Sequence, residues 1–416
     1  MHRWASELFP FNRSLTGHGT LKTLNYLKSL LPDLEIKSIE SGAKVFDWTI
    51  PNVWNIKDAY IRDLQGKSLI DFKESNLHVM GYSIPVRGIF TRDELEKHIH
   101  VLTEQPNAIP YVTSYYKDSW AFCMTLIQWE SLGEGPFEVL IDSKKEPGEL
   151  LYAEIFIPGS TSQEVLFSTY VCHPSMANNE LSGPVVLTKL IQEILTIPNR
   201  HYSYRAIFIP ETIGSLVFLS RNLEHLKKHL IAGWVMTCLG DPGKFSYIPS
   251  RLGSTYADRM SLEILDSLVE PFTRYSWNDR GSDERQFCAP GVDLPVCSIT
   301  KTKYGEYPEY HTSLDNLEFI TPGGLSESLD LYLQIVLHLE NNRTPKINTL
   351  GEPQLGKRNL YPNTSIMNNS SVRELMNVIS YLDGQHNLVE IAKKLSIEVD
   401  EVSRIISVLE KNELLD

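Results

Sequence analysis

Between residues 164 and 339, apolar runs of strand length alternate with amphipathic runs of helix length. Strands are predicted at 165–172, 204–210, 231–239 and 294–300, and helices at 181–195, 213–230, 256–269 and 325–339. Continuous apolar strands joined by helices are typical of a mainly parallel sheet that helices cover on both faces. We therefore expect an α/β body with such a sheet at its centre.

Two other parts differ from this body, and a chain of 416 residues is too long for one ordinary core. Residues 58–146 hold short β-like runs between turn residues, with one helix-like run at 92–101. They predict a small β-rich domain inserted into an α/β domain of residues 1–57 and 147–345. Residues 346–416 begin with a linker rich in Pro, Gly and Asn and continue with three helical patterns that resemble a winged helix.

The charge of the chain bears on its partners. The net charge of −13 argues against broad binding to nucleic acid or to an anionic membrane. The winged-helix segment, 365–416, holds 5 Lys and Arg against 9 Asp and Glu, whereas a helix that reads DNA normally lies on a basic face. We therefore expect this segment to dock a partner or form a homo-oligomer, with DNA binding as the less favoured alternative.

Cysteine usage and the absence of long apolar runs bear on the compartment. The chain has five cysteines, an odd number without a CxxC pair, which suits free thiols in a reducing environment. It shows no apolar core of a secretory signal and no run of about 18 apolar residues. We expect a cytoplasmic protein without a membrane span.

Chemically useful side chains stand where two predicted strands end. The first strand ends on His173, a polar loop then carries Glu180, and Glu211 ends the next strand. In open α/β sheets, ligands bind outside the carboxyl ends of the strands. An imidazole and a carboxylate near one another can hold zinc. Each residue also has a plain structural interpretation: His173 as a strand-end histidine, and the two acids as caps of the helices that follow.

Two later segments can contribute to the same place. His311 lies in the polar run EYHTSLDNLE, where Asp315 could accept a hydrogen bond from its ring or could cap a local turn. Asp283 and Glu284 follow a Gly-Ser pair. They could begin a helix, or they could face a cationic substrate group such as a free amino terminus.

Several motifs carry a resemblance to a known family. The segments CHPSMANNELSG, PETIGS and EYHTSLDNL occur in the order found in the zinc-aminopeptidase superfamily. With FPFNRSLTG and FDWTIPNVWNI near the N-terminus, they resemble more closely a bacterial group of aminopeptidase-like proteins. The resemblance covers nearly the whole chain. It implies a peptidase-like body with an inserted β domain and a C-terminal winged helix.

The sequence departs from the superfamily at its acidic positions. Asn179 stands where the resemblance implies a bridging aspartate, Thr212 replaces the second of two adjacent glutamates, and Thr237 lies near the place of a third acidic ligand. Fewer acids imply fewer metal ions, because an amide lacks the charge that bridges two zincs. We therefore expect one zinc rather than two.

The resemblance also implies roles for individual residues. The expected zinc ligands are His173, Glu180 and His311, with the fourth position open as in catalytic sites. Glu211 is the expected general base, although spacing alone does not separate a base from a ligand. The expected substrate contacts are Asn179, Asp283, Glu284 and Tyr310.

Three functional hypotheses follow. The first is zinc-dependent amide hydrolysis, most simply by an aminopeptidase acting on small peptides, with the inserted domain restricting entry. The second is deacylation of a non-peptide metabolite such as an amino sugar. The third is a peptidase-like binding protein that has lost catalysis, which the missing acids would explain.

Overall fold

The computed structural model describes residues 1–360 and 370–415. The chain forms two compact units. The larger contains Met1–Ile157, Gln163–Pro198 and Tyr204–Leu333, and the smaller contains Pro158–Ser162, Asn199–Ser203 and Gln334–Asp416. Residues 361–363 of the predicted linker lie outside the described part of the chain.

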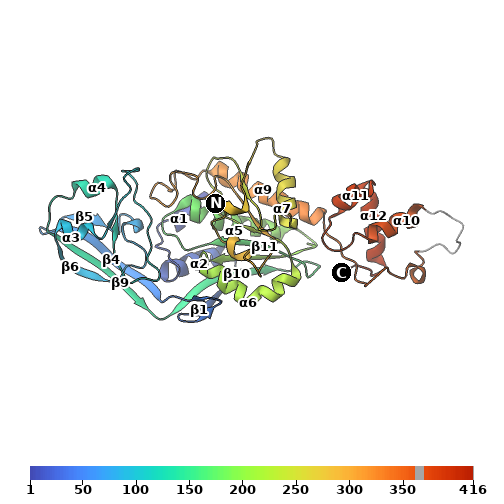
Figure 1. Cartoon of the computed structure of the whole chain (residues 1–416), viewed down its shortest axis with the longest axis horizontal. Coiled ribbons are helices and arrows are strands. Elements are labelled where there is room, and N and C mark those ends of the chain that lie inside the picture. The colour runs from blue at the N-terminus through green and yellow to red at the C-terminus, as the bar shows by residue number, and fades with distance from the viewer. Residues whose placement is uncertain (361–369, 416) are drawn as a thin grey trace. The chain divides into compact units, whose positions relative to one another are not determined.

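A sheet that includes β1, β10 and β11 forms the centre of the larger unit (Figure 1). It has eight strands in the order β1-β10-β12-β11-β13-β16-β14-β15. Neighbouring strands β11, β13 and β16 run parallel, whereas β1, β10 and β12 at one side and the β14–β16 pair at the other are antiparallel. The predicted α/β fold with a mostly parallel central sheet is therefore confirmed. The strands are β1 Glu35–Glu40, β10 Glu149–Ile157, β11 Glu164–Tyr170, β12 Ser203–Ile209, β13 Leu230–Val235, β14 Ser246–Ile248, β15 Thr273–Arg274 and β16 Val296–Thr300.

Helices cover both faces of this sheet, because the alternating side chains of its buried strands are apolar on both sides. Leu166 of β11 belongs to the apolar cluster that packs against α6. The next residue, Phe167, points to the other face, where its ring stacks on Trp234 and meets Tyr332 of α9 edge-on. The helices of this body are α1 His2–Leu8, α2 His18–Leu30, α5 Ser182–Thr196, α6 Ile213–His229, α7 Tyr256–Asp266, α8 Glu284–Phe287 and α9 Pro322–Asn341.

The segment between β1 and β10 builds the β-rich insertion. Its sheet has the order β5-β4-β9-β6, with long antiparallel strands β4 (Val53–Asp63) and β9 (Phe137–Glu146) at the centre. The helix predicted at 92–101 is only half correct. A capping box begins α3 (Arg92–Glu96), but Ile99–His100 pairs as strand β7 with β8. The other elements between β1 and β10 are β2 Lys44–Val45, β3 Trp48–Thr49, β5 Ser68–Asp71, η1 Asn76–His78, β6 Val86–Phe90, β8 Phe122–Cys123 and α4 Leu126–Ser131. The short helix η3 (Trp277–Asp279) belongs to the body.

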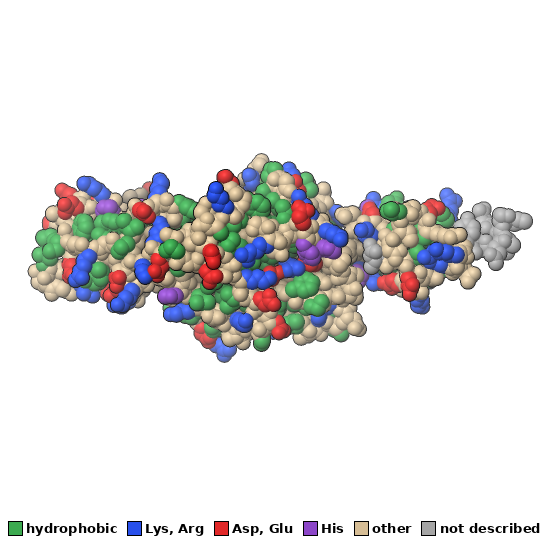
Figure 2. All heavy atoms as spheres, turned by 90° about the horizontal axis from the view of Figure 1, so that it is seen from below, with side chains coloured by type: hydrophobic (Ala, Val, Ile, Leu, Met, Phe, Trp, Pro, Cys, Tyr) green, Lys and Arg blue, Asp and Glu red, His purple; other side chains and the backbone are tan. Residues whose placement is uncertain are grey.

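The smaller unit contains the C-terminal helices, α10 (Ser370–Ile379), α11 (Leu388–Leu395) and α12 (Val399–Lys411), preceded by η4 (Leu355–Arg358). Their apolar faces form one core, because Val378, Ile391, Val402 and Ile406 are buried together. The first turn of α12 carries Asp400 and Glu401. On the face drawn in Figure 2, acidic and basic side chains are interspersed over this unit.

Two further observations concern the described residues. All five cysteines are buried and free, as expected for small apolar side chains in strand-like runs. None of the described helices combines the length and the apolar character that a membrane crossing requires.

Candidate functional site

The candidate site lies where the central strands end. His173 follows β11 by three residues, and Glu211 follows β12 by two. A π-helical turn, η2 (Ala177–Leu181), leads into α5 and carries Glu180. Single π-helical turns of this kind occur often at functional sites. The carboxyl edge of the sheet thus holds the residues that the sequence analysis placed there.

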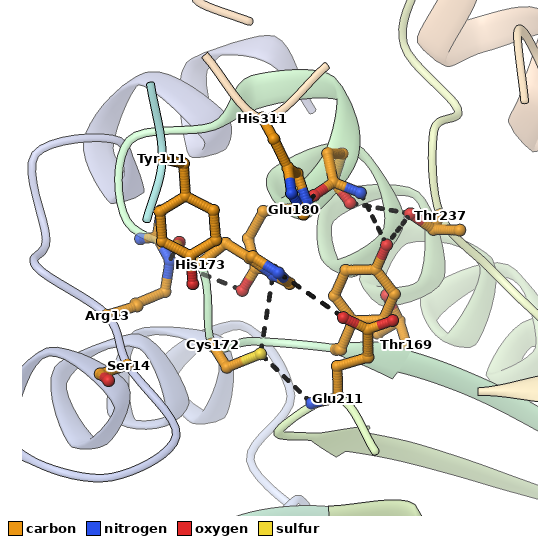
Figure 3. A network of polar contacts seen from close by, with 12 residues as sticks. Arg13, Ser14, Tyr111, Thr169, Cys172, His173, Glu180, Glu211, Thr237 and His311 are labelled. Atoms are coloured by element: carbon orange, nitrogen blue, oxygen red, sulfur yellow. Dashed lines mark hydrogen bonds and ion pairs between the residues drawn. The ribbon is translucent and has the colours of Figure 1, made fainter. Parts of the chain in front are cut away.

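The two nitrogens of His173 face two different carboxylates (Figure 3). Nδ1 lies 2.6 Å from Oε2 of Glu180, which is fully buried, and Nε2 lies 3.6 Å from Oε2 of Glu211. The ring of His311 comes from a segment more than 130 residues away in sequence, and its centroid is 5.3 Å from that of His173. The structure therefore brings together both predicted histidines and both predicted acids.

His311 is held by aromatic and amide neighbours. Its Nε2 lies 3.2 Å from Oδ1 of Asn179, whose amide nitrogen donates to the hydroxyl of Tyr170 at 2.8 Å. Tyr310 stacks on the imidazole at 3.9 Å between centroids. Tyr111 of the insertion meets the rings of both histidines, each at 5.2 Å between centroids. The β-rich segment between β1 and β10 therefore contributes directly to the site.

Arg13, in the N-terminal motif FPFNRSLTG, is a member of the site that the sequence analysis did not identify. Its side chain is fully buried. Nε donates to the carbonyl of His173 at 2.8 Å, Nη1 donates to the carbonyl of Leu8 at 2.6 Å, and Nε lies 3.8 Å from Oε1 of Glu180. The resemblance of this motif was the only sequence signal for Arg13, because a local sequence pattern does not show whether an arginine is buried.

Four residues other than glycine adopt positive φ in the loops that follow the central strands: Ser175 (45°), Thr212 (64°), Cys238 (51°) and His311 (55°). Such conformations cost about 1–3 kcal/mol each and cluster at functional sites. The most unusual is Thr212, because a β-branched side chain rarely tolerates positive φ. With ψ of −69° and a 2.7 Å hydrogen bond from the amide of Ile213 to the carbonyl of Glu211, it forms a tight γ-turn.

Burial determines the charge states of the ionisable groups. It lowers the pKa of His173 to about 3, with Arg13 as a second cause, and the pKa of His311 to about 3, with His173 as a second cause. Both imidazoles are therefore neutral, which is the form that binds metals. Burial also raises the pKa of Glu211 to about 8, followed in importance by repulsion from Asp283.

A cavity of about 510 Å³ opens onto these groups. His173, His311 and Glu211 lie on its wall. A second part of the wall is aromatic and is made by Trp48, Tyr111, Tyr115 and Tyr116. A volume of this size matches the sites that proteins use for small molecules.

The structure places four other expected residues off the cavity wall. Asp283 and Glu284 are fully buried. Asp283 accepts hydrogen bonds from the amide of Thr212 and the hydroxyl of Ser215, and Glu284 accepts them from two backbone amides and the hydroxyl of Tyr304. Asn179 and Tyr310 contact His311 and do not line the cavity.

Asp315 caps a turn, which was the alternative interpretation of this residue, but the turn is η2 and not a local one. Its carboxylate accepts the backbone amides of Asn178 at 2.6 Å and Asn179 at 2.9 Å, so it caps the π-helical turn. The ring of His311 contacts Asn179 instead.

The glycine at position 183, in the first turn of α5, is required by close packing. A Cβ there would lie 2.3 Å from both the carbonyl of Met236 and the hydroxyl of Thr169.

Two sets of donor atoms come into question for a metal ion. On the buried side of His173, Cys172 and Glu180 offer atoms that lie within 4.8 Å of one another and of the imidazole. A cation there would meet the charge of Arg13 and would break the 2.6 Å contact to Nδ1. On the cavity side, the donors are Nε2 of His173, the ring of His311, the oxygen of Asn179 and the carboxylate of Glu211. Among the described residues, only the first set brings three His, Cys, Asp or Glu ligand atoms within 4.8 Å of one another, but the cavity side offers neutral imidazoles and an open approach, as catalytic zinc sites do.

Comparisons with known proteins agree with this architecture. Residues 2–342 match the family described as "Domain of unknown function (DUF4910)", and residues 343–416 match the family described as winged helix-turn-helix. A Clostridium acetobutylicum protein named "Putative polysaccharide biosynthesis protein with aminopeptidase-like domain" is 42% identical over 412 residues, which cover 98% of this chain and 94% of the relative.

Solved structures show the same fold. The crystal structure of a "putative peptidase" from Clostridium acetobutylicum has a TM-score of 0.83 at 41% identity and covers 100% of this chain and 95% of its own. BSAP, a zinc aminopeptidase from Bacillus subtilis, has a TM-score of 0.54 at 13% identity over 81% of this chain and 93% of its own. At that identity it shows the fold alone. The chain belongs to the DUF4910 family, with an aminopeptidase-like α/β body followed by a C-terminal winged helix-turn-helix domain.

Proposed function

We propose that the protein is a zinc-dependent hydrolase of amide bonds, of the aminopeptidase type, acting on small substrates. The observation that carries the proposal is the pair of neutral imidazoles, His173 and His311, which converge beside Glu211 on the wall of one cavity. Zinc binds imidazole nitrogen readily, and catalytic zinc sites keep one coordination position open to water or substrate. The cavity size favours small substrates over folded proteins.

In this proposal, His173 and His311 hold the ion, with the amide oxygen of Asn179 as a neutral third donor. Glu180, first considered a ligand, instead orients His173. Its Oε2 lies 2.6 Å from Nδ1 of His173, so the other ring nitrogen, Nε2, faces Glu211 and the cavity. Metal-binding histidines commonly donate their second N–H to a carboxylate in this way. A bound zinc ion would polarise an amide carbonyl and make water more acidic.

Glu211 is proposed as the proton acceptor. Its carboxylate lies on the cavity wall, and no side chain or backbone amide of the described residues donates a hydrogen bond to it within normal distance. A pKa of about 8 leaves this acid largely protonated at pH 7, but a cation bound beside it would favour the ionised form, which can take a proton from the attacking water and pass it to the leaving nitrogen. Two contacts restrain the backbone of Glu211: the γ-turn at Thr212, and a hydrogen bond from the amide of Glu211 to the sulfur of Cys172 at 3.2 Å.

Metal analysis combined with a hydrolysis screen tests the proposal. We expect wild-type protein, expressed with ample zinc, to hold about one ion per chain and to cleave aminoacyl amides. His173→Ala and His311→Ala should lose the metal, and exposed His18→Ala is the control that keeps it. Glu211→Gln should keep zinc and lose turnover by about 100- to 10,000-fold.

Other results would contradict these assignments. Loss of zinc in Glu211→Gln, to the extent seen in the histidine variants, would make Glu211 a ligand. A wild-type protein that binds no transition metal and cleaves no amide would overturn the hydrolase proposal in favour of a binding protein that has lost catalysis.

One comparison favours a second candidate substrate. The Clostridium acetobutylicum relative carries a name that assigns it to polysaccharide biosynthesis. The same site could then remove an acyl group from an amino sugar, a reaction that also cleaves an amide. A panel of N-acetylated sugars beside the aminoacyl amides decides between the two, because each hypothesis predicts turnover in one panel only.

For the winged-helix unit we propose docking or self-association rather than DNA binding. Asp400 and Glu401 lie in the first turn of α12, where a recognition helix would approach DNA, and their charges would repel phosphates. Light scattering on the full chain tests self-association. A salt-dependent shift of duplex DNA by the full chain would contradict the proposal.

A further inference from the structure

The cavity wall contains an unusual positive charge. Among the described residues that line the cavity, Glu211 is the one acid and Arg285 is the one group with a permanent positive charge. The remaining lining is imidazole, aromatic, aliphatic or neutral polar. A guanidinium beside a site that cleaves amides can select a substrate by its charge.

Arg285 is held in place but has donors to spare. Its Nη2 donates to the hydroxyl of Thr212 at 2.6 Å. Within the described part of the chain, no carboxylate lies within 4 Å of its guanidinium, and this hydroxyl is the one side-chain acceptor that it meets. A guanidinium has five N–H donors in a planar fork, so most of them remain available at the cavity.

The anchor of Arg285 is rigid. Thr212 forms the γ-turn next to Glu211, and its amide donates to Asp283 at 2.7 Å. Asp283 also accepts the hydroxyl of Ser215 in α6. The hydrogen bond to Thr212 therefore tethers one end of the exposed Arg285 side chain next to Glu211, the proposed proton acceptor. A tether of this kind favours the orientation of a substrate between the two groups.

We infer that Arg285 binds a free carboxylate of the substrate. This inference rests on the proposed function and adds the substrate class: small amides that carry a carboxylate and an apolar or aromatic side chain, such as dipeptides and N-acyl amino acids. A guanidinium recognises a carboxylate through two parallel hydrogen bonds. The side chain of the substrate would pack on the aromatic wall of Trp48, Tyr111, Tyr115 and Tyr116.

A plain electrostatic role is the competing explanation. Arg285 lowers the pKa of Glu211 and of Asp283 against the larger effect of burial, so it could act only by balancing their charge. That role would affect neutral and anionic substrates equally. Recognition of a carboxylate affects the anionic substrate selectively, so the ratio of the two separates the explanations.

The first experiment compares matched substrates with the zinc-loaded full chain. Alanyl-phenylalanine and its C-terminal amide differ only in the carboxylate. We expect wild-type kcat/KM to favour the acid by on the order of 10- to 100-fold, from hydrogen bonds to a charged group. Arg285→Gln should bring the ratio near one, and Arg285→Lys should restore part of it, because a lysine keeps the charge without the fork. Arg280→Gln is the control, since Arg280 is exposed and contacts Trp277.

The second experiment measures binding without turnover. Titration calorimetry with metal-free protein compares 3-phenylpropionate with 3-phenylpropionamide, so that zinc itself cannot bind the carboxylate. We expect wild type to bind the carboxylate on the order of tenfold or more tightly than the amide, and Arg285→Gln to bind both alike. An equal affinity of wild type for both, or a preference that survives in Arg285→Gln, would overturn the inference. If neither dipeptide is cleaved, the proposed hydrolase fails, whereas the binding experiment still decides on Arg285.

Discussion

Glu180 and His173 form a buried pair in which Oε2 lies 2.6 Å from Nδ1, and Arg13 accompanies the carboxylate at 3.8 Å. Burial raises the pKa of Glu180, and Arg13 is the largest opposing influence. In its ionised form, which the charge of Arg13 favours, Glu180 would accept a hydrogen from Nδ1 and leave the lone pair of Nε2 toward the cavity. The arrangement resembles the carboxylate partners that orient metal-binding histidines elsewhere.

Glu180→Gln tests this orienting role. We expect the zinc affinity to fall by about 10- to 100-fold, the usual effect of losing an orienting partner. His173→Ala should instead abolish binding, because it removes the ligand itself. Competition with a zinc chelator measures both, and Glu193→Gln, in a half-buried ion pair with Lys189 on another face of α5, is the control. If Glu180→Gln loses zinc as completely as His173→Ala, Glu180 is a ligand.

Asn179→Asp should strengthen metal binding. The amide oxygen lies 3.2 Å from Nε2 of His311, so a carboxylate there would add a negative charge next to the ion. Opposite charges about 4 Å apart attract by about 4 kcal/mol at an effective dielectric constant of about 20, and desolvation removes part of this gain. We therefore expect an affinity on the order of 10- to 100-fold higher by calorimetry.

The control for this variant is Gln286→Glu, which adds the same charge elsewhere on the cavity wall. It should change the affinity less than Asn179→Asp does. Equal gains in the two variants would show that the site responds to charge in general and that residue 179 does not contact the ion.

Gly183→Ala should destabilise the fold. Its Cβ would lie 2.3 Å from two atoms, one of them the backbone carbonyl of Met236, which has little freedom to move. Overpacking of this kind costs about 1–3 kcal/mol. Urea denaturation measures the loss, and Gly323→Ala in the first turn of α9 is the control, because its nearest neighbouring atom is 3.9 Å away. A free energy of unfolding that is unchanged in Gly183→Ala would contradict the close packing.

Glu164 should contribute a pH-dependent part of the stability. Its oxygens accept from Nε of Arg205 at 2.8 Å and Nη2 at 3.2 Å, and they also contact His225. Burial alone would raise the pKa of Glu164, but these hydrogen bonds outweigh it and lower the pKa. Because the folded pKa lies below the unfolded value of about 4.3, the stabilisation is complete above that pH and is lost as the pH falls through the folded pKa.

Glu164→Gln should therefore be less stable than wild type by about 3 kcal/mol at pH 7, as for a broken buried pair. The difference should narrow as the pH falls through the lowered folded pKa of Glu164, where the wild-type carboxylate becomes protonated. Denaturation curves at several pH values measure it, with Glu193→Gln again as the surface control. A difference that stays constant down to pH 3 would assign the effect to packing rather than to charge.

The sequence alone determined four of the eight strands of the central sheet (β11, β12, β13 and β16), most of its helices and the strand ends that carry His173 and Glu211. These features depend on local periodicity, which burial on both faces of a sheet imposes on every strand. The helix predicted at 92–101 failed in its second half because Ile99–His100 pairs with a strand more than 20 residues away. A capping box reports where a helix begins, but the pairing that ends it is not local.

Only the tertiary structure decided how the site is built. The spacing from His173 to Glu180 does not show which ring nitrogen the carboxylate meets, and the approach of Arg13 and Tyr111 depends on packing across more than 60 residues of sequence. Glu284 points inward and Arg285 reaches the cavity, although they are neighbours in sequence, because successive residues of a helical turn point about 100° apart. Charge and burial at one position depend on what the rest of the chain places around it, and a local pattern does not contain that information.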